Sequence, residues 1–259
     1  MRIIAPSELI INGDGSIFHL HLKPGQLADT VILVGDPGRV EQVAAYFDSV
    51  ECRAENREFV AVTGECFGKR MTVQSTGIGT DNIDIVVNEL DALANIDFET
   101  RTEKAEKTRL TLVRLGTCGG IQPELKIGDL VLSRISAGFD GLLNFYKGRN
   151  AVCDLEMEQD FVEHTGWSRL LTAPYFVRCS DYLAELFAPD TVEGMTASAP
   201  GFYAPQGRYL RLAPADRRLN EKIESFEYGG HRFTNFEMEG SALAGLSRLM
   251  GHDSVTICT

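Results

Sequence analysis

The chain has 259 residues, a formal net charge of −12 at neutral pH and a hydrophobic content of 44%. This length suffices for a large α/β core, whereas the acidic balance argues against nucleic acid and anionic membranes as partners, because both require a basic face. No run of about 18 apolar residues occurs and the N-terminus has no apolar core behind a basic end, so we expect neither a transmembrane helix nor a signal peptide.

Short apolar runs bounded by glycine alternate with helical patterns along the chain. This alternation is typical of a mostly parallel sheet wrapped by helices. Most of the runs are continuous, as in strands that are covered on both faces. No linker rich in Ser, Gly or Pro interrupts them, so we predict a single domain over residues 1–259. The predicted strands are 30–35, 70–77, 109–116, 129–133 and 254–258.

Helix signals lie between these runs. Asp36 suits the cap of a helix that has Pro37 in its first turn and ends near Phe47. Asp81 suits the cap of a second helix. The part from Arg134 to Trp167 gives no readable pattern. The remaining apolar periodicity predicts helices over 83–93, 215–226 and 240–250.

Three predicted strands end in small residues rather than ordinary turns. These ends are GDPGR at 35–39, STGIGTDN at 75–82 and VRLGTCGG at 113–120. The C-terminal strand ends of an open parallel sheet converge on one crevice, and helix N-termini there favour an anion. Arg39 and Arg114 would then share a pocket with backbone N–H groups and the Thr117 hydroxyl. That donor set suits a phosphate oxyanion, because guanidinium groups match its geometry.

Each of these features also has a simpler interpretation. Glycine-rich turns follow strands in many α/β folds, and Asn82 stands where a dinucleotide-binding fingerprint requires its third glycine, which disfavours a nicotinamide cofactor. Arg114 alone would suit an ion pair at a strand end. Cys118, between small residues, would suit packing, because nothing in the sequence gives it a partner base.

The cysteine and histidine patterns give no support for a metal. Six cysteines are present without C-x-x-C spacing, which favours reduced thiols and a cytoplasmic protein. His19 and His21 alternate along FHLHL and would share one face of a strand. Without a third ligand, no metal site is predicted.

The motifs in combination are more specific than any one of them. GDPxR, NREF at 56–59, STGIG, RxGTxGG and NFEMEGSA at 235–242 occur in an order that resembles the nucleoside phosphorylase family, the branch with uridine phosphorylases and hexameric purine nucleoside phosphorylases. The resemblance extends from Phe18 to Cys258. GFYAPQGR at 201–208 is similar to an element of uridine phosphorylases and points to a pyrimidine. The fold implied is one α/β domain, with a mixed, mostly parallel, twisted and partly barrel-like sheet flanked by helices.

The resemblance implies phosphorolysis of uridine to uracil and ribose 1-phosphate, in nucleoside salvage. Inorganic phosphate is the co-substrate, and Arg39, Arg114 and Glu239 are the implied catalytic residues. Arg57 and His19 would reach the site from a neighbouring subunit. A carboxylate suits two vicinal hydroxyl donors, because it only accepts when ionised. The implied phosphate-binding residues are Gly35, Arg39, Arg57, Arg114 and Thr117, and the implied ribose-binding residues are His19, Met238 and Glu239.

For the base, the resemblance implies Cys118, Gly119, Phe202, Gln206 and Arg208. A glutamine amide presents both a donor and an acceptor to uracil, and a nearby arginine favours the anionic leaving group. Phe202 would stack on the ring, although core packing is the simpler role for it and for Tyr203. For Glu237 and Glu239 the simpler role is the acidic preference of a helix start.

The implied partners are a nucleoside, phosphate and further copies of the chain, as a dimer or as a hexamer built from dimers. No cofactor is implied, although a monovalent cation, potassium, would fit near Glu58 and Ser75. The chain departs from the family at Asp81, Asn82 and Asp84, where we expect an altered helix cap. Family members also continue past the strand at 254–258 into a further element and a helix, which we expect to be missing here.

Three other functions remain open on these residues. A hydrolytic nucleosidase of the same fold would not need Arg39, Arg57 and Arg114. A purine nucleoside phosphorylase is disfavoured by Gln206 and Arg208. A nucleoside-binding protein without activity is the non-enzymatic alternative.

Overall fold

The computed structural model describes residues 2–259, which group into two compact units that are described separately. Unit 1 comprises the residues up to 78 together with 82–115 and 250–253. Unit 2 comprises 79–81, 116–249 and 254–259. The expected single domain over residues 1–259 therefore stays a prediction.

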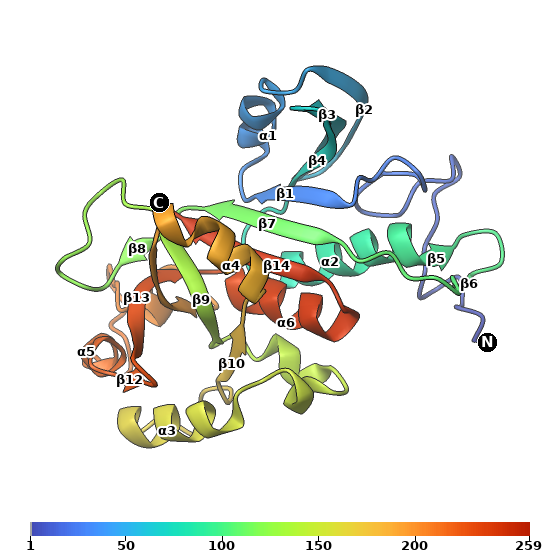
Figure 1. Cartoon of the computed structure of the whole chain (residues 1–259). Helices are drawn as coiled ribbons and strands as arrows, with labels where there is room; N and C mark the ends of the chain where they lie inside the picture. The colour runs from blue at the N-terminus through green and yellow to red at the C-terminus, as the bar shows by residue number, and fades with distance from the viewer. Residues whose placement is uncertain (1) are drawn as a thin grey trace. The chain divides into compact units, whose positions relative to one another are not determined.

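The sheet of unit 1 has the strand order β7-β1-β4-β3-β2. β1 is parallel to β4 and to β7, whereas β3 is antiparallel to β4 and β2 is antiparallel to β3 at the edge of the sheet (Figure 1). The predicted strands 30–35, 70–77 and 109–116 are confirmed as β1, β4 and β7, and β2 and β3 were not predicted. The bounds are β1 Thr30–Val34, β2 Ser49–Asn56, β3 Phe59–Cys66, β4 Lys69–Ser75 and β7 Thr111–Gly116.

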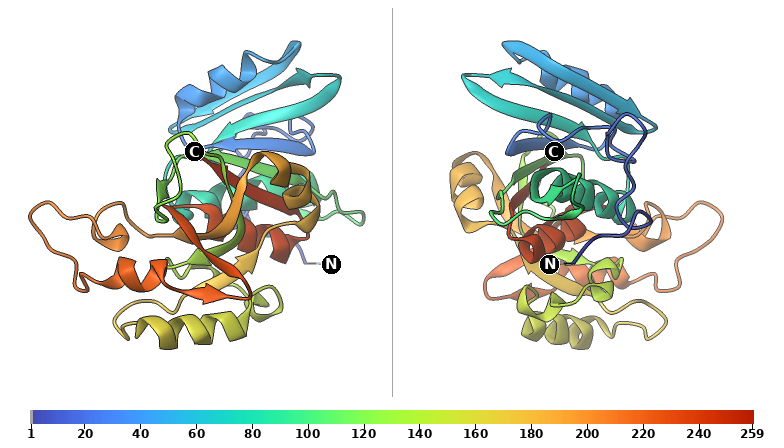
Figure 2. Two further views of the ribbon diagram at one scale, coloured as in Figure 1. Left: turned by 60° about the vertical axis from the view of Figure 1, so that its left-hand side comes forward. Right: turned by 90° about the vertical axis from the view of Figure 1, so that its right-hand side faces the viewer.

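Two helices accompany these strands. α1 (Pro37–Ala44) is capped as predicted, because the Asp36 carboxylate accepts a hydrogen bond from Gly38 N at 2.8 Å, but it ends before Phe47. α2 (Thr80–Asn95) begins earlier than predicted, so Asp81 lies within its first turn. α1 packs against β3 and β4, as Figures 1 and 2 show. The core beneath it consists of Val34, Val40, Ala44, Val62 and Val73.

The segment FHLHL is not a strand, so the prediction that His19 and His21 share a strand face is wrong. Ile17 N donates to Leu22 O at 2.8 Å, which closes a turn, and His21 has a φ of 54° inside it. That left-handed backbone breaks the alternation on which the prediction depended. A short ladder, β5 (Ile96–Asp97) with β6 (Thr102–Glu103), follows α2.

The sheet of unit 2 has the strand order β12-β13-β11-β9-β14, with β10 also paired to β9 and β8 to β13. β9, β11 and β13 run parallel, and the other pairs are antiparallel. Predicted strand 129–133 is β9, which extends into the segment without a readable pattern, and 254–258 is β14. The bounds are β8 Gly119–Gly120, β9 Val131–Gly138, β10 Tyr175–Arg178, β11 Val192–Ser198, β12 Glu227–Tyr228, β13 His231–Glu237 and β14 Asp253–Cys258.

Two helices of unit 2, α3 and α5, contribute to an aromatic core in which Phe161 stacks on Phe139 with ring centroids 5.5 Å apart. The helix predicted over 240–250 is confirmed as α6. The one predicted over 215–226 is shorter, because Arg218 N donates to the Asp216 carboxylate in a turn before it. The helices are α3 Leu155–Thr165, α4 Asp181–Phe187, α5 Leu219–Glu224 and α6 Gly240–Met250, with 3₁₀ turns at Leu142–Phe145, Arg149–Ala151, Ala188–Asp190 and Ala204–Gln206. Within residues 2–259, every helix is too short or too polar to traverse a lipid bilayer.

Candidate active site

The C-terminal ends of β1, β4 and β7 lie level with one another in unit 1. Val34 is opposite Ser75 on one side and Leu115 on the other. Beyond the strands, Thr76 N donates to Val34 O at 2.7 Å and Gly77 N donates to Gly35 O at 3.0 Å. The two glycine-containing segments that were predicted to converge therefore leave the sheet side by side.

Arg39 projects from the first turns of α1 across this edge. Its Nη1 donates to the carbonyl oxygen of Leu115 at 3.1 Å, so the guanidinium lies beside the residue that follows Arg114. A Cβ on Gly35 would lie 3.3 Å from Arg39 Nη2, which explains why a residue without a side chain suits that position. Arg114 itself is 3% exposed within β7. The structure thus brings Gly35, Arg39 and the strand that carries Arg114 together.

Arg57 and His19, the two residues expected to serve a neighbouring subunit, belong to adjoining turns. Arg57 is exposed between β2 and β3 and has a φ of 56°. The preceding residue, Asn56, donates from Nδ2 to His19 O at 2.9 Å. Whether they reach another copy stays a prediction.

Glu58 and Ser75, near which a monovalent cation would fit, are in direct contact. The Ser75 hydroxyl donates to Glu58 O at 2.6 Å, and the Glu58 carboxylate accepts from Asn82 Nδ2 at 3.2 Å. Across residues 2–259, no three His, Cys, Asp or Glu side chains gather as ligands for a metal ion.

In unit 2, the two glutamates of the NFEMEGSA motif differ in what they bind. The Glu237 carboxylate accepts the N–H groups of Glu239 and Gly240, each at 2.8 Å, and so caps the start of α6. The Glu239 carboxylate instead accepts Gly79 N at 2.7 Å. Both are 4% exposed, and Met238 between them is partly exposed. The simpler role expected for both glutamates, at the helix start, thus applies to Glu237.

The loop that contains Thr117 and Cys118 is fixed at both ends by backbone pairing. Cys118 N donates to Thr259 O at 3.0 Å, and Thr259 N donates to Gly116 O at 3.2 Å. Gly119 then pairs with Phe236 of β13. The loop consequently runs beside the strand that ends at the glutamates, and the Thr117 side chain at its start is exposed.

Three of the five predicted base-binding residues, Gly119, Phe202 and Gln206, lie next to a fourth, Arg208, in unit 2. They lie on β8 and on the long loop between β11 and α5, which Figure 2 shows extending from that unit in orange. The Arg208 guanidinium donates to the Gln206 side-chain oxygen and to Phe202 O, and it lies 4.2 Å from the centroid of the Phe202 ring. A Cβ on Gly119 would be 3.0 Å from Arg208 Nη2. The expected stacking of Phe202 on a base stays a prediction, because its ring meets arginine here.

A buried polar network that the sequence did not predict supports Glu237. Its Oε1 accepts from the Ser198 hydroxyl, which in turn accepts Ser241 N at 2.9 Å. Ser241 Oγ donates to Asp140 at 2.9 Å, and Tyr175 Oη donates to the same carboxylate at 3.0 Å. Asp140 follows β9 in the segment without a readable pattern, so no local signal marked it.

We predict a pH dependence of stability from Asp140. Burial raises its pKa above the ordinary 3.8, against the hydrogen bonds from Leu142 N, Ser241 and Tyr175, which lower it. The folded state therefore holds this proton more tightly than the unfolded state does, so the stability contribution of Asp140 increases as the pH falls toward its ordinary pKa. As the pH is lowered from 7 toward 3.8, the melting temperature of the native protein should rise relative to that of Asp140→Asn. Parallel melting curves across this range would contradict the prediction.

Comparisons with known proteins show the family and the fold of this chain. The family model of the phosphorylase superfamily matches residues 29–259. A uridine phosphorylase of Thermococcus kodakarensis is 30% identical over 95% of this chain and 76% of its own length. A DeoD-type purine nucleoside phosphorylase of Alkaliphilus metalliredigens is 31% identical, over 93% and 85%. The crystal structure of a Trypanosoma brucei nucleoside phosphorylase, described as showing uridine phosphorylase activity, superposes with a TM-score of 0.86 at 30% identity, covering 96% of this chain and 89% of that one. The predicted fold class, mixed α/β with a mostly parallel sheet flanked by helices, is confirmed.

Proposed function

Because the chain belongs to the phosphorylase superfamily, we propose that it cleaves uridine with inorganic phosphate to give uracil and ribose 1-phosphate. The predicted family and the predicted class of enzyme, a phosphorylase that transfers a pentosyl group, are confirmed by the comparisons. One observation carries the proposal: the Arg39 guanidinium donates a hydrogen bond to Leu115 O, at the edge of the sheet where β1, β4 and β7 end side by side. The contact between Gln206 and Arg208 supports a pyrimidine as the base.

In the proposed reaction a phosphate oxygen bonds to the anomeric carbon as the bond from that carbon to the base nitrogen breaks. The bonding electrons leave with uracil, while positive charge develops on the ribose. Uracil gains one proton overall, which balances the proton that hydrogen phosphate loses when it becomes ribose 1-phosphate. The protein must hold phosphate and sugar in line and stabilise the departing base. These are tasks for positioned charges rather than for a cofactor, and we propose none beyond the phosphate co-substrate.

We assign roles in this reaction by the resemblance. Glu239 accepts hydrogen bonds from the ribose 2′- and 3′-hydroxyls, Met238 packs on the sugar, and His19 of a neighbouring subunit meets the 5′-hydroxyl. The amide of Gln206 pairs with the base, beside Cys118 and Gly119, while Arg208 favours its anionic form and Phe202 stacks on it. Phosphate is bound by Gly35, Arg39, Arg114 and Thr117, with Arg57 of the neighbour.

The proposal extends to the biological setting. Residues contributed by a neighbour imply a homo-oligomer, either a dimer or a hexamer of three dimers. Reduced cysteines fit a cytoplasmic enzyme of nucleoside salvage. Potassium near Glu58 and Ser75 would add a cation next to the strand ends.

Turnover of uridine with and without phosphate tests the proposal. Cleavage only with phosphate supports phosphorolysis, equal cleavage without it indicates a nucleosidase, and no cleavage indicates a binding protein. Inosine is the matched purine substrate, because a purine nucleoside phosphorylase is also among the relatives. Faster turnover of inosine than of uridine would make the purine the substrate.

Arg208→Ala is expected to reduce the preference for uridine over inosine by about 10- to 100-fold, because it removes charged hydrogen bonds next to the base. The measurement is the ratio of kcat/KM for the two nucleosides. Arg211→Ala, which removes an exposed arginine of the same loop, is the control and should keep the native ratio. If Arg208→Ala lowers kcat/KM for uridine and for inosine by the same factor, Arg208 does not contribute to discrimination between the two bases.

A further inference from the structure

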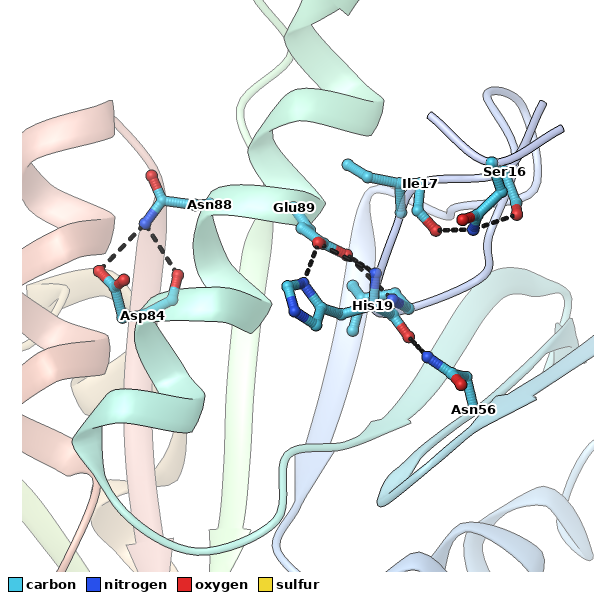
Figure 3. Close-up of polar contacts among 9 residues, drawn as sticks. Ser16, Ile17, His19, Asn56, Asp84, Asn88 and Glu89 are labelled. Atoms are coloured by element: carbon cyan, nitrogen blue, oxygen red, sulfur yellow. Dashed lines mark hydrogen bonds and ion pairs between the residues drawn. The ribbon is translucent and has the colours of Figure 1, made fainter. Parts of the chain in front are cut away.

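The Glu89 carboxylate on α2 accepts three donors from the turn that carries His19 (Figure 3). His19 N lies 3.1 and 3.0 Å from its two oxygens, Leu20 N lies 2.9 Å from Oε2, and the ring Nδ1 of His19 lies 2.6 Å from Oε1. The carboxylate side chain is 13% exposed and the histidine side chain 25%. Glu89 thus fixes both the backbone and the ring of one residue.

This contact sets which ring nitrogen carries the proton. An ionised carboxylate can only accept, so Nδ1 must donate, and a neutral imidazole then has its lone pair on Nε2. Among residues 2–259, His19 Nε2 makes no hydrogen bond. In its neutral form the ring therefore presents an acceptor, at a defined orientation, to a molecule that lies against the turn.

A second anchor holds the same turn from the opposite side. Asn56 Nδ2 donates to His19 O at 2.9 Å, and Figure 3 shows His19 between Asn56 and Glu89. Asn56 directly precedes Arg57, whose φ of 56° turns the chain there. The turn of His19 is therefore linked by a hydrogen bond to the residue that precedes Arg57.

We propose that Glu89 is a positioning residue that keeps His19 protonated on Nδ1, so that Nε2 accepts a hydrogen bond from the primary hydroxyl of a nucleoside. The inference rests on the proposed function, because that function supplies the nucleoside. It adds the direction of the hydrogen bond, from hydroxyl to imidazole, and the residue that imposes it. A site built to bond a hydroxyl discriminates against the analogue that lacks it, because its own polar group is then left unpaired.

The test compares kcat/KM for uridine and for 5′-deoxyuridine, which lacks that hydroxyl. Glu89→Gln should lower the uridine to 5′-deoxyuridine ratio about tenfold, the equivalent of one hydrogen bond. In a His19→Ala background, Glu89→Gln should leave the ratio unchanged. An unchanged ratio in the single variant, or an equal loss with both nucleosides, would overturn the proposal.

Asp91→Asn is the matched control. Asp91 lies on the same helix and accepts a hydrogen bond from a different imidazole, with His252 Nε2 at 3.1 Å from Oδ1. It also accepts from Asn95. This variant removes a carboxylate beside a buried histidine without touching His19, so it should lower thermal stability and keep the native ratio of the two nucleosides.

The nitrogen spectrum of histidine-labelled protein tests the protonation directly and needs no turnover. In the native protein, the His19 signals, identified by their loss in His19→Ala, should show a protonated Nδ1 and an unprotonated Nε2. In Glu89→Gln they should shift toward a mixture of the two tautomers. A proton on Nε2 in the native protein would overturn the inference. A native protein that turns over neither nucleoside would instead refute the proposed function, and the spectrum would still decide the role of Glu89.

Discussion

Arg114→Ala is expected to lower kcat for phosphorolysis of uridine by about 10²- to 10³-fold, the usual loss on removing one preorganised donor. Arg114 is 3% exposed on β7, opposite Leu33 of β1, and the next residue along the strand accepts a hydrogen bond from Arg39. A guanidinium held in such a water-poor place interacts strongly with phosphate, because little solvent screens its charge. Initial rates at saturating phosphate and uridine measure the effect.

Two further variants make this result interpretable. Arg109→Ala removes an arginine just before β7 that forms an exposed ion pair with Asp253, and it should keep native activity. Arg114→Lys keeps the positive charge but loses the fork of guanidinium donors, so it should restore only part of the rate. A folded Arg114→Ala protein with native dependence on phosphate would exclude Arg114 from the site.

An element could be predicted from the sequence when the residues that determine it lie within the element itself. β1, α1 and α6 were predictable because a capping aspartate, a proline at a helix start and continuous apolar periodicity all lie within the elements themselves. β13 was not predicted, because its polar residues look unsuited to a buried strand. The side-chain oxygen of Asn235 accepts a hydrogen bond from Thr196 of β11 at 2.8 Å, and this partner is remote in the sequence.

The same distinction applies to the candidate site. The glycine-rich strand ends and Arg39 could be recognised from short motifs, since the residues that form them are neighbours in the chain. Nothing in the sequence connects His19 with Glu89, seventy residues later. The turn that carries His19 was mistaken for a strand for a related reason, because Glu89 and Asn56, both distant in the sequence, hold the backbone of His19 and Leu20. Short motifs identify candidate site residues, whereas contacts between residues distant in the sequence determine where those residues lie.

The neighbouring glutamates Glu237 and Glu239 provide the second large expected effect. Glu239→Gln should lower kcat/KM for uridine by about 10²- to 10³-fold, because it weakens two charge-assisted hydrogen bonds to the ribose hydroxyls. The loss with 2′-deoxyuridine should be smaller, because that substrate lacks one of the two donors. The ratio of kcat/KM for uridine to that for 2′-deoxyuridine is therefore the measurement.

Glu237→Gln is the matched control, two residues away and equally buried. Its carboxylate accepts the N–H groups of Glu239 and Gly240, so its replacement should cost about 1 kcal/mol of stability through the weakened cap of α6. It should lower the melting temperature and keep the ratio of the two nucleosides near its native value. If the two variants instead changed this ratio alike, the assignment of helix capping to Glu237 and of ribose binding to Glu239 would be wrong. Both carboxylates would then have to contact the sugar.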